Sequence, residues 1–146
     1  RDPVLLTAFL ADRPDALLER LKSSGVDIGR AAAIAAGPAT PAGEGEVDVR
    51  RWLSRVTPPV ARDLVALHTL ATGQAPRWSP AMQLILDRRD PLDRGALAVS
   101  GSDLIAAGIP KGPELGHALQ RLLDFVLDDP ARNTRDALLG HAKAAP

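Results

Sequence analysis

The feature that most constrains this chain is the placement of its glycines and prolines. The sequence holds 12 glycines and 13 prolines, and nearly all of them separate short runs in which apolar residues recur with helical spacing. Proline suits the first turn of a helix and glycine the position just past its end. No run alternates apolar and polar residues for long enough to build a sheet. The pattern predicts an all-α fold, an irregular bundle of about eight to nine helices with a glycine-rich helix–hairpin–helix near its C-terminal third.

The composition says what the core of such a bundle contains. Apolar residues make up 45% of the 146 residues but aromatic residues only 3%, so the core is built mostly from leucine, valine, isoleucine and alanine. Leucine and alanine favour helices over strands. A chain of this length forms one domain of ordinary size or two small lobes.

The charge balance limits the classes of partner. The chain has 18 basic and 18 acidic residues, which removes the simplest argument for nucleic-acid binding but not a local basic patch. Most of the basic residues are arginines, which suit phosphate contacts and intramolecular ion pairs alike. The lysines are Lys22, Lys111 and Lys143.

The middle of the chain carries a clear amphipathic helix. Asp48 is a candidate N-cap for it, and its apolar residues follow the spacing i, i+3, i+4 and i+7. These residues are Val49, Trp52, Leu53 and Val56. Arg50, Arg51 and Arg55 are therefore expected to point away from the apolar face. The stretch 37–46 has no apolar periodicity and is the best candidate for a loop or linker.

The last third of the chain is expected to hold three helices. Residues 96–99 form a candidate extended piece that leads to Ser102, a candidate cap for a short helix closed by Gly108. A strong amphipathic helix follows it. Asn133 then starts the final helix, with Asp136 three residues further on in the manner of a capping box.

The hairpin between the first two of these helices has two explanations. A helix that begins at Gly112 leaves backbone N–H groups unpaired, and its dipole adds partial positive charge there. Gly108 and Gly112 let a phosphate approach closely, and Lys111 adds a formal charge, as in modules that grip a nucleic-acid backbone without reading sequence. An ordinary turn explains the same residues, because Gly108 can be only a helix C-cap and Pro113 only a helix starter.

No set of residues predicts a reaction. His68, His117 and His141 lie far apart in sequence, and none has a partner at metal-ligand spacing. The chain holds no serine-nucleophile elbow, phosphate-binding loop or zinc-peptidase motif. Acidic and basic residues interleave over 87–94, which is typical of an ion-paired helix end. We predict no catalytic and no metal-binding residue in this chain.

The compartment follows from what the sequence lacks. It has no cysteine, which fits a cytoplasmic protein. No apolar run approaches the roughly 20 residues that a membrane span needs, so no membrane partner is expected. The chain begins at Arg1 rather than methionine, directly on a helical pattern, and is therefore expected to be a fragment or a processed chain.

The stretch GSDLIAAGIPKGPELG at 101–116 carries a family resemblance. With the leucine-rich helix after it and Asn133 ahead of the last helix, it resembles the tail of tRNA nucleotidyltransferases, in the bacterial branch of the CCA-adding enzyme and poly(A) polymerase family. The resemblance is strong over 99–139. It is looser upstream, where VRRWLSRV at 49–56 and LLERLKSSG at 17–25 are similar to stretches of the family's helical body.

The resemblance implies a body-like region over 1–95 and a tail-like region over 96–146, without the catalytic head. Family heads carry a Gly-Ser motif with paired metal-binding aspartates, an Arg-Arg-Asp motif and a nucleotide-reading neck motif. Residues 88–90 spell the second motif, but Pro91 follows and the position is wrong, so we treat the match as coincidence. Magnesium and CTP or ATP are expected only in the missing head, and the chain alone is expected to be inactive.

In the family, the helical body and tail hold the tRNA by its shape and backbone. The resemblance therefore implies tRNA and the catalytic head as partners, and a role in tRNA processing within a transferase that adds CCA, A or poly(A). The residues expected to contact RNA are Lys111, Gly112, Gly116, Arg121, Arg132, Arg135 and Lys143 in the tail, and Arg50, Arg51 and Arg55 in the body. The alternative is a stand-alone all-α module for protein interaction or dimerisation.

Overall fold

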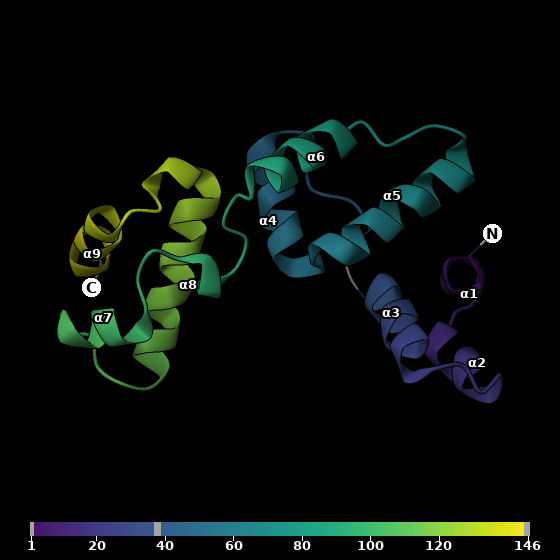
Figure 1. The fold of residues 1–146 in the computed structure, drawn as a ribbon, viewed down its shortest axis with the longest axis horizontal. Helices are drawn as coiled ribbons and strands as arrows, with labels where there is room; N and C mark the ends of the chain where they lie inside the picture. The colour runs from purple at the N-terminus through teal and green to yellow at the C-terminus, as the bar shows by residue number, and fades with distance from the viewer. Residues whose placement is uncertain (1, 37–38, 145–146) are drawn as a thin grey trace. The chain divides into compact units, whose positions relative to one another are not determined.

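The computed structural model describes residues 2–36 and 39–144, so the first two residues of the expected linker at 37–46 lie outside the described part. Within these ranges the chain forms nine α-helices and two short 3₁₀ helices, without a strand, which confirms the all-α prediction (Figure 1). In order they are α1 (Pro3–Leu10), α2 (Pro14–Arg20), α3 (Gly25–Ala36), α4 (Glu46–Val56), α5 (Pro58–Thr72), α6 (Ser79–Arg88), η1 (Arg94–Ala96), α7 (Gly101–Ala106), α8 (Pro113–Asp128), η2 (Pro130–Arg132) and α9 (Arg135–Ala144).

The chain divides into two compact units. Unit 1 comprises Arg1–Gln83 and unit 2 comprises Leu84–Pro146, so the division falls inside α6. The family resemblance implies a different boundary, between residues 95 and 96, which separates a body-like from a tail-like region. That boundary stays a prediction.

Unit 1 begins with three helices that pack on one another. Val4, Leu18 and Ala31, one from each helix, form a small buried cluster with Ile28 against it. Asp2 caps α1, since its Oδ1 accepts a hydrogen bond from the backbone N–H of Val4 at 2.9 Å. Such a cluster of small aliphatic side chains is what a chain poor in aromatic residues can build.

One arginine ties these helices to α5. The Arg30 side chain on α3 donates to both carboxylate oxygens of Asp63 on α5, at 2.8 and 2.7 Å. Its Nη1 also lies 2.9 Å from Oδ2 of Asp2. Bidentate pairs of this kind fix geometry as well as add energy. Arg30 therefore links α1, α3 and α5.

Helix α4 buries the face that its spacing predicts, but it begins earlier than expected. The four apolar residues at 49, 52, 53 and 56 are all buried. Gly45 is the N-cap and the helix starts at Glu46, so the assignment of Asp48 as N-cap is wrong. The backbone explains the shift, because the N–H of Val49 already bonds the carbonyl oxygen of Gly45 at 3.0 Å.

Arg50 corrects a second expectation for α4. The residue is only 4% exposed, rather than pointing away from the buried face. Its Nη1 donates to Oε2 of Glu46, one turn earlier, at 3.1 Å. A long arginine stem can lie along apolar surface while its charged end finds a partner, so a helical period alone does not place it.

The two tryptophans mark the core of the second half of unit 1. Trp52 on α4 and Trp78, just before α6, meet edge to face, with ring centroids 4.6 Å apart and planes at 62°. Both residues are buried. Aromatic pairs favour this geometry because the positive edge of one ring meets the negative face of the other.

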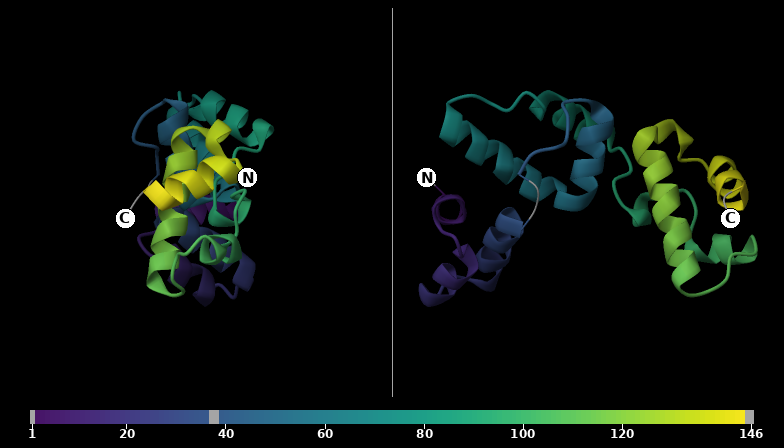
Figure 2. Two further views of the ribbon diagram at one scale, coloured as in Figure 1. Left: turned by 90° about the vertical axis from the view of Figure 1, so that its left-hand side faces the viewer. Right: turned by 180° about the vertical axis from the view of Figure 1, so that it is seen from behind.

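Unit 2 is built around α8. Figures 1 and 2 show α7 and α9 lying on the same side of this helix. The buried cluster between them consists of Leu97, Val99, Leu104, Ala118, Leu122, Val126, Leu138 and Ala142. The long amphipathic helix thus gives its apolar face to two shorter helices, and the turn between α7 and α8 is held at one end of it.

The Arg30 pair generates a stability prediction. Arg30→Ala leaves Asp63 half-buried without its bidentate partner, so the free energy of unfolding of unit 1 should fall by about 1–2 kcal/mol. Urea unfolding followed by tryptophan fluorescence measures this, since both tryptophans lie in unit 1. The control is Arg62→Ala, which removes an exposed arginine from α5. Equal effects from the two variants would contradict the assigned role of Arg30.

Candidate nucleic-acid interface

The first helix of the hairpin, α7, is capped by Ser100. Its Oγ accepts from the backbone N–H of Asp103 at 3.2 Å, and the Asp103 carboxylate accepts in return from the Ser100 N–H at 2.8 Å. This is a reciprocal capping box, so the expectation that Ser102 is the cap is wrong. The expected extended piece also begins later, because η1 includes Ala96 and the backbone is extended at Leu97.

Two glycines shape the turn that follows. Gly108 has φ 101° and Gly112 has φ 114°, conformations that side chains with a Cβ rarely adopt. At the end of α7, the N–H of Ile109 bonds the carbonyl oxygen of Leu104 at 3.0 Å, which closes the helix with a glycine C-cap. The positive φ angles of the turn therefore account for glycine at 108 and 112 without any ligand.

Two other glycines of the motif behave differently from each other. A Cβ on Gly101 would lie 3.4 Å from Cδ2 of Leu115, an ordinary van der Waals separation, so the Leu115 side chain packs directly on the backbone of α7 at this glycine. Gly116 has an ordinary φ, and a Cβ there would meet nothing within 4 Å. Neither crowding nor backbone strain in the described structure requires glycine at 116.

Asn133 joins the two ends of unit 2. Its side-chain amide donates to the carbonyl oxygen of Ala96 at 2.9 Å, and its side-chain oxygen accepts from the N–H of Ala98 at 2.8 Å. The helix α9 begins only at Arg135. The expectation that Asn133 starts it is therefore wrong, because its side chain binds the segment before α7 instead.

Arg135 makes a second tie between α9 and α7. Its Nη1 donates to Oδ1 of Asp103 at 2.6 Å. Hydrogen bonds from the Ser100 hydroxyl, then from the Ser100 backbone N–H, then from Arg135 lower the pKa of Asp103 to about 2. The carboxylate that caps α7 thus also anchors α9.

The predicted RNA-contacting cations of unit 2 fall into two groups. Arg135 pairs with Asp103, while Arg132 lies 3.5 Å from the Asp129 carboxylate and 4.7 Å from the centroid of the Phe125 ring. Lys111, Arg121 and Lys143 are exposed, and within the described residues they make no hydrogen bond or ion pair. The second group is the one that has its charge available to a ligand.

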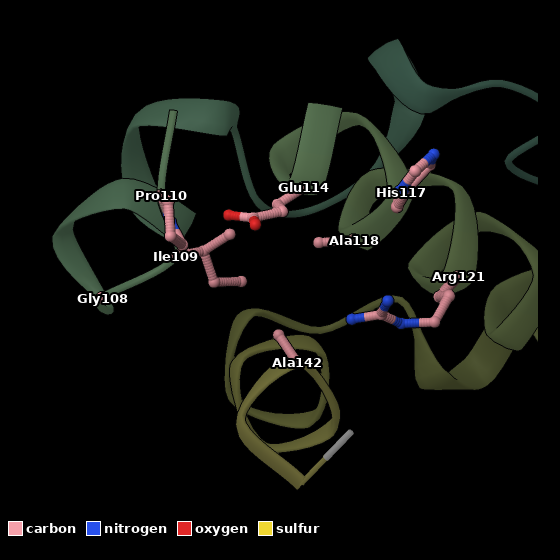
Figure 3. Close-up of a pocket in the computed structure, with 8 residues that line it drawn as sticks. All are labelled: Gly108, Ile109, Pro110, Glu114, His117, Ala118, Arg121 and Ala142. Atoms are coloured by element: carbon pink, nitrogen blue, oxygen red, sulfur yellow. The ribbon is translucent and has the colours of Figure 1, made fainter. Parts of the chain in front are cut away.

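A cavity opens beside the hairpin, with a volume of about 340 Å³. It is lined by Gly108, Ile109, Pro110, Glu114, His117, Ala118, Arg121 and Ala142 (Figure 3). Sequence reasoning selected Arg121 for its charge but assigned no site role to Glu114 or His117. The spacing of 114, 117 and 121 places these residues on one face of a helix, which was the available signal in the sequence. The opposite wall of the cavity is formed by α9, and no sequence pattern predicts that α9 lies there.

The predicted arginines of α4 are also separated by the structure. Arg51 and Arg55 line a second cavity of about 280 Å³ in unit 1, together with Thr40, Ala42, Asp48 and Trp52. Arg50 is buried and does not line it. The structure therefore brings two of the three arginines together and removes the third from the surface.

The described residues contain no group of three or more histidine, aspartate or glutamate side chains placed to hold a metal ion. No helix in the described ranges is both long and apolar enough to span a membrane. Comparison of the chain with protein-family models, curated proteins and solved structures found no match.

The Asp103 network generates a pH prediction. The pKa of Asp103 in the folded chain lies below its ordinary value of 3.8, so its ionised form stabilises unit 2. This contribution is complete above about pH 4 and is lost as the pH falls toward 2. Ser100→Ala should raise the pKa of Asp103 more than Arg135→Ala does, as measured by NMR titration of the carboxyl carbon.

A control variant tests the assignment of that shift. Arg132→Ala, which removes a neighbouring cation with no contact to Asp103, should leave the pKa of Asp103 unchanged. A larger rise in Arg135→Ala than in Ser100→Ala would contradict the dominance of the capping interaction.

Proposed function

We propose that this chain is the tRNA-binding body and tail region of a tRNA nucleotidyltransferase, whose catalytic head adds CCA or A to tRNA 3′ ends. The single observation that carries the proposal is the turn between α7 and α8. There Lys111, exposed and without an ion-pair partner among the described residues, precedes the N-terminus of a 16-residue helix. In this role the chain binds the RNA by its shape and backbone and performs no chemistry itself.

The arrangement of backbone groups supports the proposal. The first turn of α8 offers N–H groups and the positive end of the helix dipole, and Gly112 has no side-chain cap that would occupy them. A phosphate at this point would meet Lys111 and the backbone together. Arg121 and Lys143 supply further available charge in the same unit.

The ion pairs within the chain bear on how strongly it would bind RNA. Arg30, Arg88 and Arg135 are each paired with aspartates within their own unit. Such arginines neutralise the protein's own carboxylates and contribute little to RNA affinity. We therefore expect an isolated chain to contact only a few phosphates and to bind weakly, with a dissociation constant of about 10⁻⁶ M or higher.

Replacement of Lys111 tests the proposal. Lys111→Ala should leave folding unchanged, because the side chain is exposed, and should weaken tRNA binding and flatten its salt dependence by about one phosphate contact. Fluorescence anisotropy with labelled tRNA at two salt concentrations measures both effects. Lys22→Ala, an exposed lysine of unit 1, is the charge-matched control. No binding at low salt, or binding that ignores salt, would contradict the proposal.

Gly116 provides a test that does not depend on charge. Gly116→Ala should raise the free energy of unfolding by about 1 kcal/mol, because alanine is the better helix former and the space is open. If RNA lies against Gly116, the added methyl group should weaken tRNA binding several-fold. Gly140→Ala in α9, where the space is equally open, should stabilise the chain and leave tRNA affinity unchanged. Equal affinity in the two variants would remove Gly116 from the interface.

A second candidate function, a protein-interaction or dimerisation module, is favoured by one observation in unit 1. Leu17 on α2 and Leu21, the C-cap of that helix, are 39% and 65% exposed, and Val26 on α3 is 80% exposed. Exposed apolar side chains that gather in one patch mark interaction sites. A stable oligomer without tRNA affinity in light scattering and anisotropy would support this function over RNA binding, and a monomer that binds tRNA would contradict it.

A further inference from the structure

The cavity of unit 2 combines an apolar floor with opposite charges at its rim. Ile109 and Pro110 border it on the hairpin side, Ala118 lies at its centre on α8, and Ala142 faces it from α9. Its volume of about 340 Å³ lies in the range of small-ligand sites. The cavity is therefore large enough for a compact ligand with a flat apolar part.

The charges stand at two ends of this floor. Glu114 and Arg121 are seven residues apart on α8, which corresponds to roughly 10 Å along the axis. Figure 3 shows the Glu114 carboxylate extending over Ile109 and Pro110, and the Arg121 guanidinium extending toward Ala142. Within the described residues neither side chain makes a hydrogen bond or an ion pair. The site thus offers an acceptor at one end and an anion-binding group at the other.

A ligand that complements this site has N–H donors at one end, a flat ring in the middle and a negative charge at the other end. A nucleotide has these three parts in this order. Lys111 follows Pro110 in the chain and is exposed without lining the cavity, so it is available to a further phosphate of the same RNA. A peptide would require oppositely charged side chains at a matching separation, and would gain nothing from Lys111 beside its donor end.

We propose that this cavity binds one unstacked guanosine nucleotide of an RNA, with the base edge on Glu114 and a phosphate on Arg121. The inference rests on the proposed RNA-binding function and specifies its ligand. The base lies on Ala118 between Ile109 and Ala142, and it is unpaired, since sequence-specific binding of RNA targets unpaired bases. Unit 2 then reads one base in addition to gripping the backbone.

The preference for guanine follows from the chemistry of a carboxylate. An ionised glutamate only accepts hydrogen bonds, and guanine alone presents two adjacent donors, N1–H and the N2 amino group, on its pairing edge. Adenine and cytosine place a ring acceptor beside their amino group, and uracil places carbonyl oxygens on both sides of its N–H. Each of these would bring lone pairs against the carboxylate. A bidentate contact should therefore separate guanine from the other bases by at least about fivefold in affinity.

The test uses the four nucleoside 5′-monophosphates and NMR of the full chain. GMP should shift the backbone amide signals of Glu114, Arg121 and Ala142 in a saturable manner. AMP, CMP and UMP should bind at least about fivefold more weakly. Equal affinities for the four nucleotides, equal shifts from inorganic phosphate alone, or equal shifts from a Lys-Ala-Asp tripeptide would overturn the proposal.

Two variants test the two ends of the site independently. Glu114→Gln keeps the shape but loses the charged acceptor, so the preference for GMP over AMP should fall to within about twofold. Arg121→Ala should weaken binding of the four nucleotides by a common factor. Glu19→Gln and Arg62→Ala, both exposed positions in unit 1, are the matched controls and should change neither quantity. A guanine preference that survives in Glu114→Gln would overturn the assigned readout.

Failure of this inference is distinguishable from failure of the proposed function. A chain that binds tRNA with salt dependence, but whose cavity signals do not respond to GMP, retains its proposed function and lacks a base pocket. A chain whose cavity selects GMP but which does not bind tRNA has a nucleotide site without the RNA function, and it overturns the inference as stated.

Discussion

The close approach of α7 to the start of α8 is the contact on which the rest of unit 2 depends. At Gly101 a Cβ would lie 3.4 Å from Cδ2 of Leu115, which is an ordinary van der Waals separation, so the Leu115 side chain packs directly on the backbone at the start of α7. The chain must then reverse over six residues, which forces positive φ at Gly108 and Gly112. The same contact exposes the turn and leaves the first N–H groups of α8 outside the core. The exposed N-terminus of α8 is thus a consequence of the short turn between the two helices.

Polar side chains, together with the buried Leu138 and Ala142, fix where α9 lies against this pair. Asp103 caps α7 and receives Arg135 from α9, while Asn133 holds the chain before α7 through both halves of its amide. Both sets of hydrogen bonds join residues that lie far apart in the sequence. Ala142 on α9 and Ala118 on α8 both line the cavity, so the position of α9 contributes to its width. A residue can therefore serve the site by positioning a wall that it does not line.

A structural feature of this chain could be predicted from the sequence where its cause lies in residues that are close together in the sequence. The apolar face of α4 and the boundaries near Gly108 follow from helical spacing and backbone sterics, and both were predictable. The choice of Ser100 over Ser102 as cap depends on which residue opens α7, a difference of two positions that spacing does not resolve. The burial of Arg50 and the cavity beside α8 depend on neighbours distant in sequence, so no local pattern contained them.

The distribution of charge argues for a site that does more than neutralise phosphates. A purely electrostatic grip would favour basic residues and exclude acidic ones, yet Glu114, three residues after the exposed Lys111, extends over the hairpin side of the cavity. A carboxylate in the first turn of α8 is favoured by the helix dipole, which accounts for its presence on the helix but not for its direction over Ile109. With Arg121 at the far end of the same floor, its position is that of an acceptor facing a ligand. A chain with 18 basic and 18 acidic residues gains more selectivity from one directional contact of this kind than from one additional cation, because a carboxylate that only accepts hydrogen bonds distinguishes between ligands and a cation on a phosphate does not.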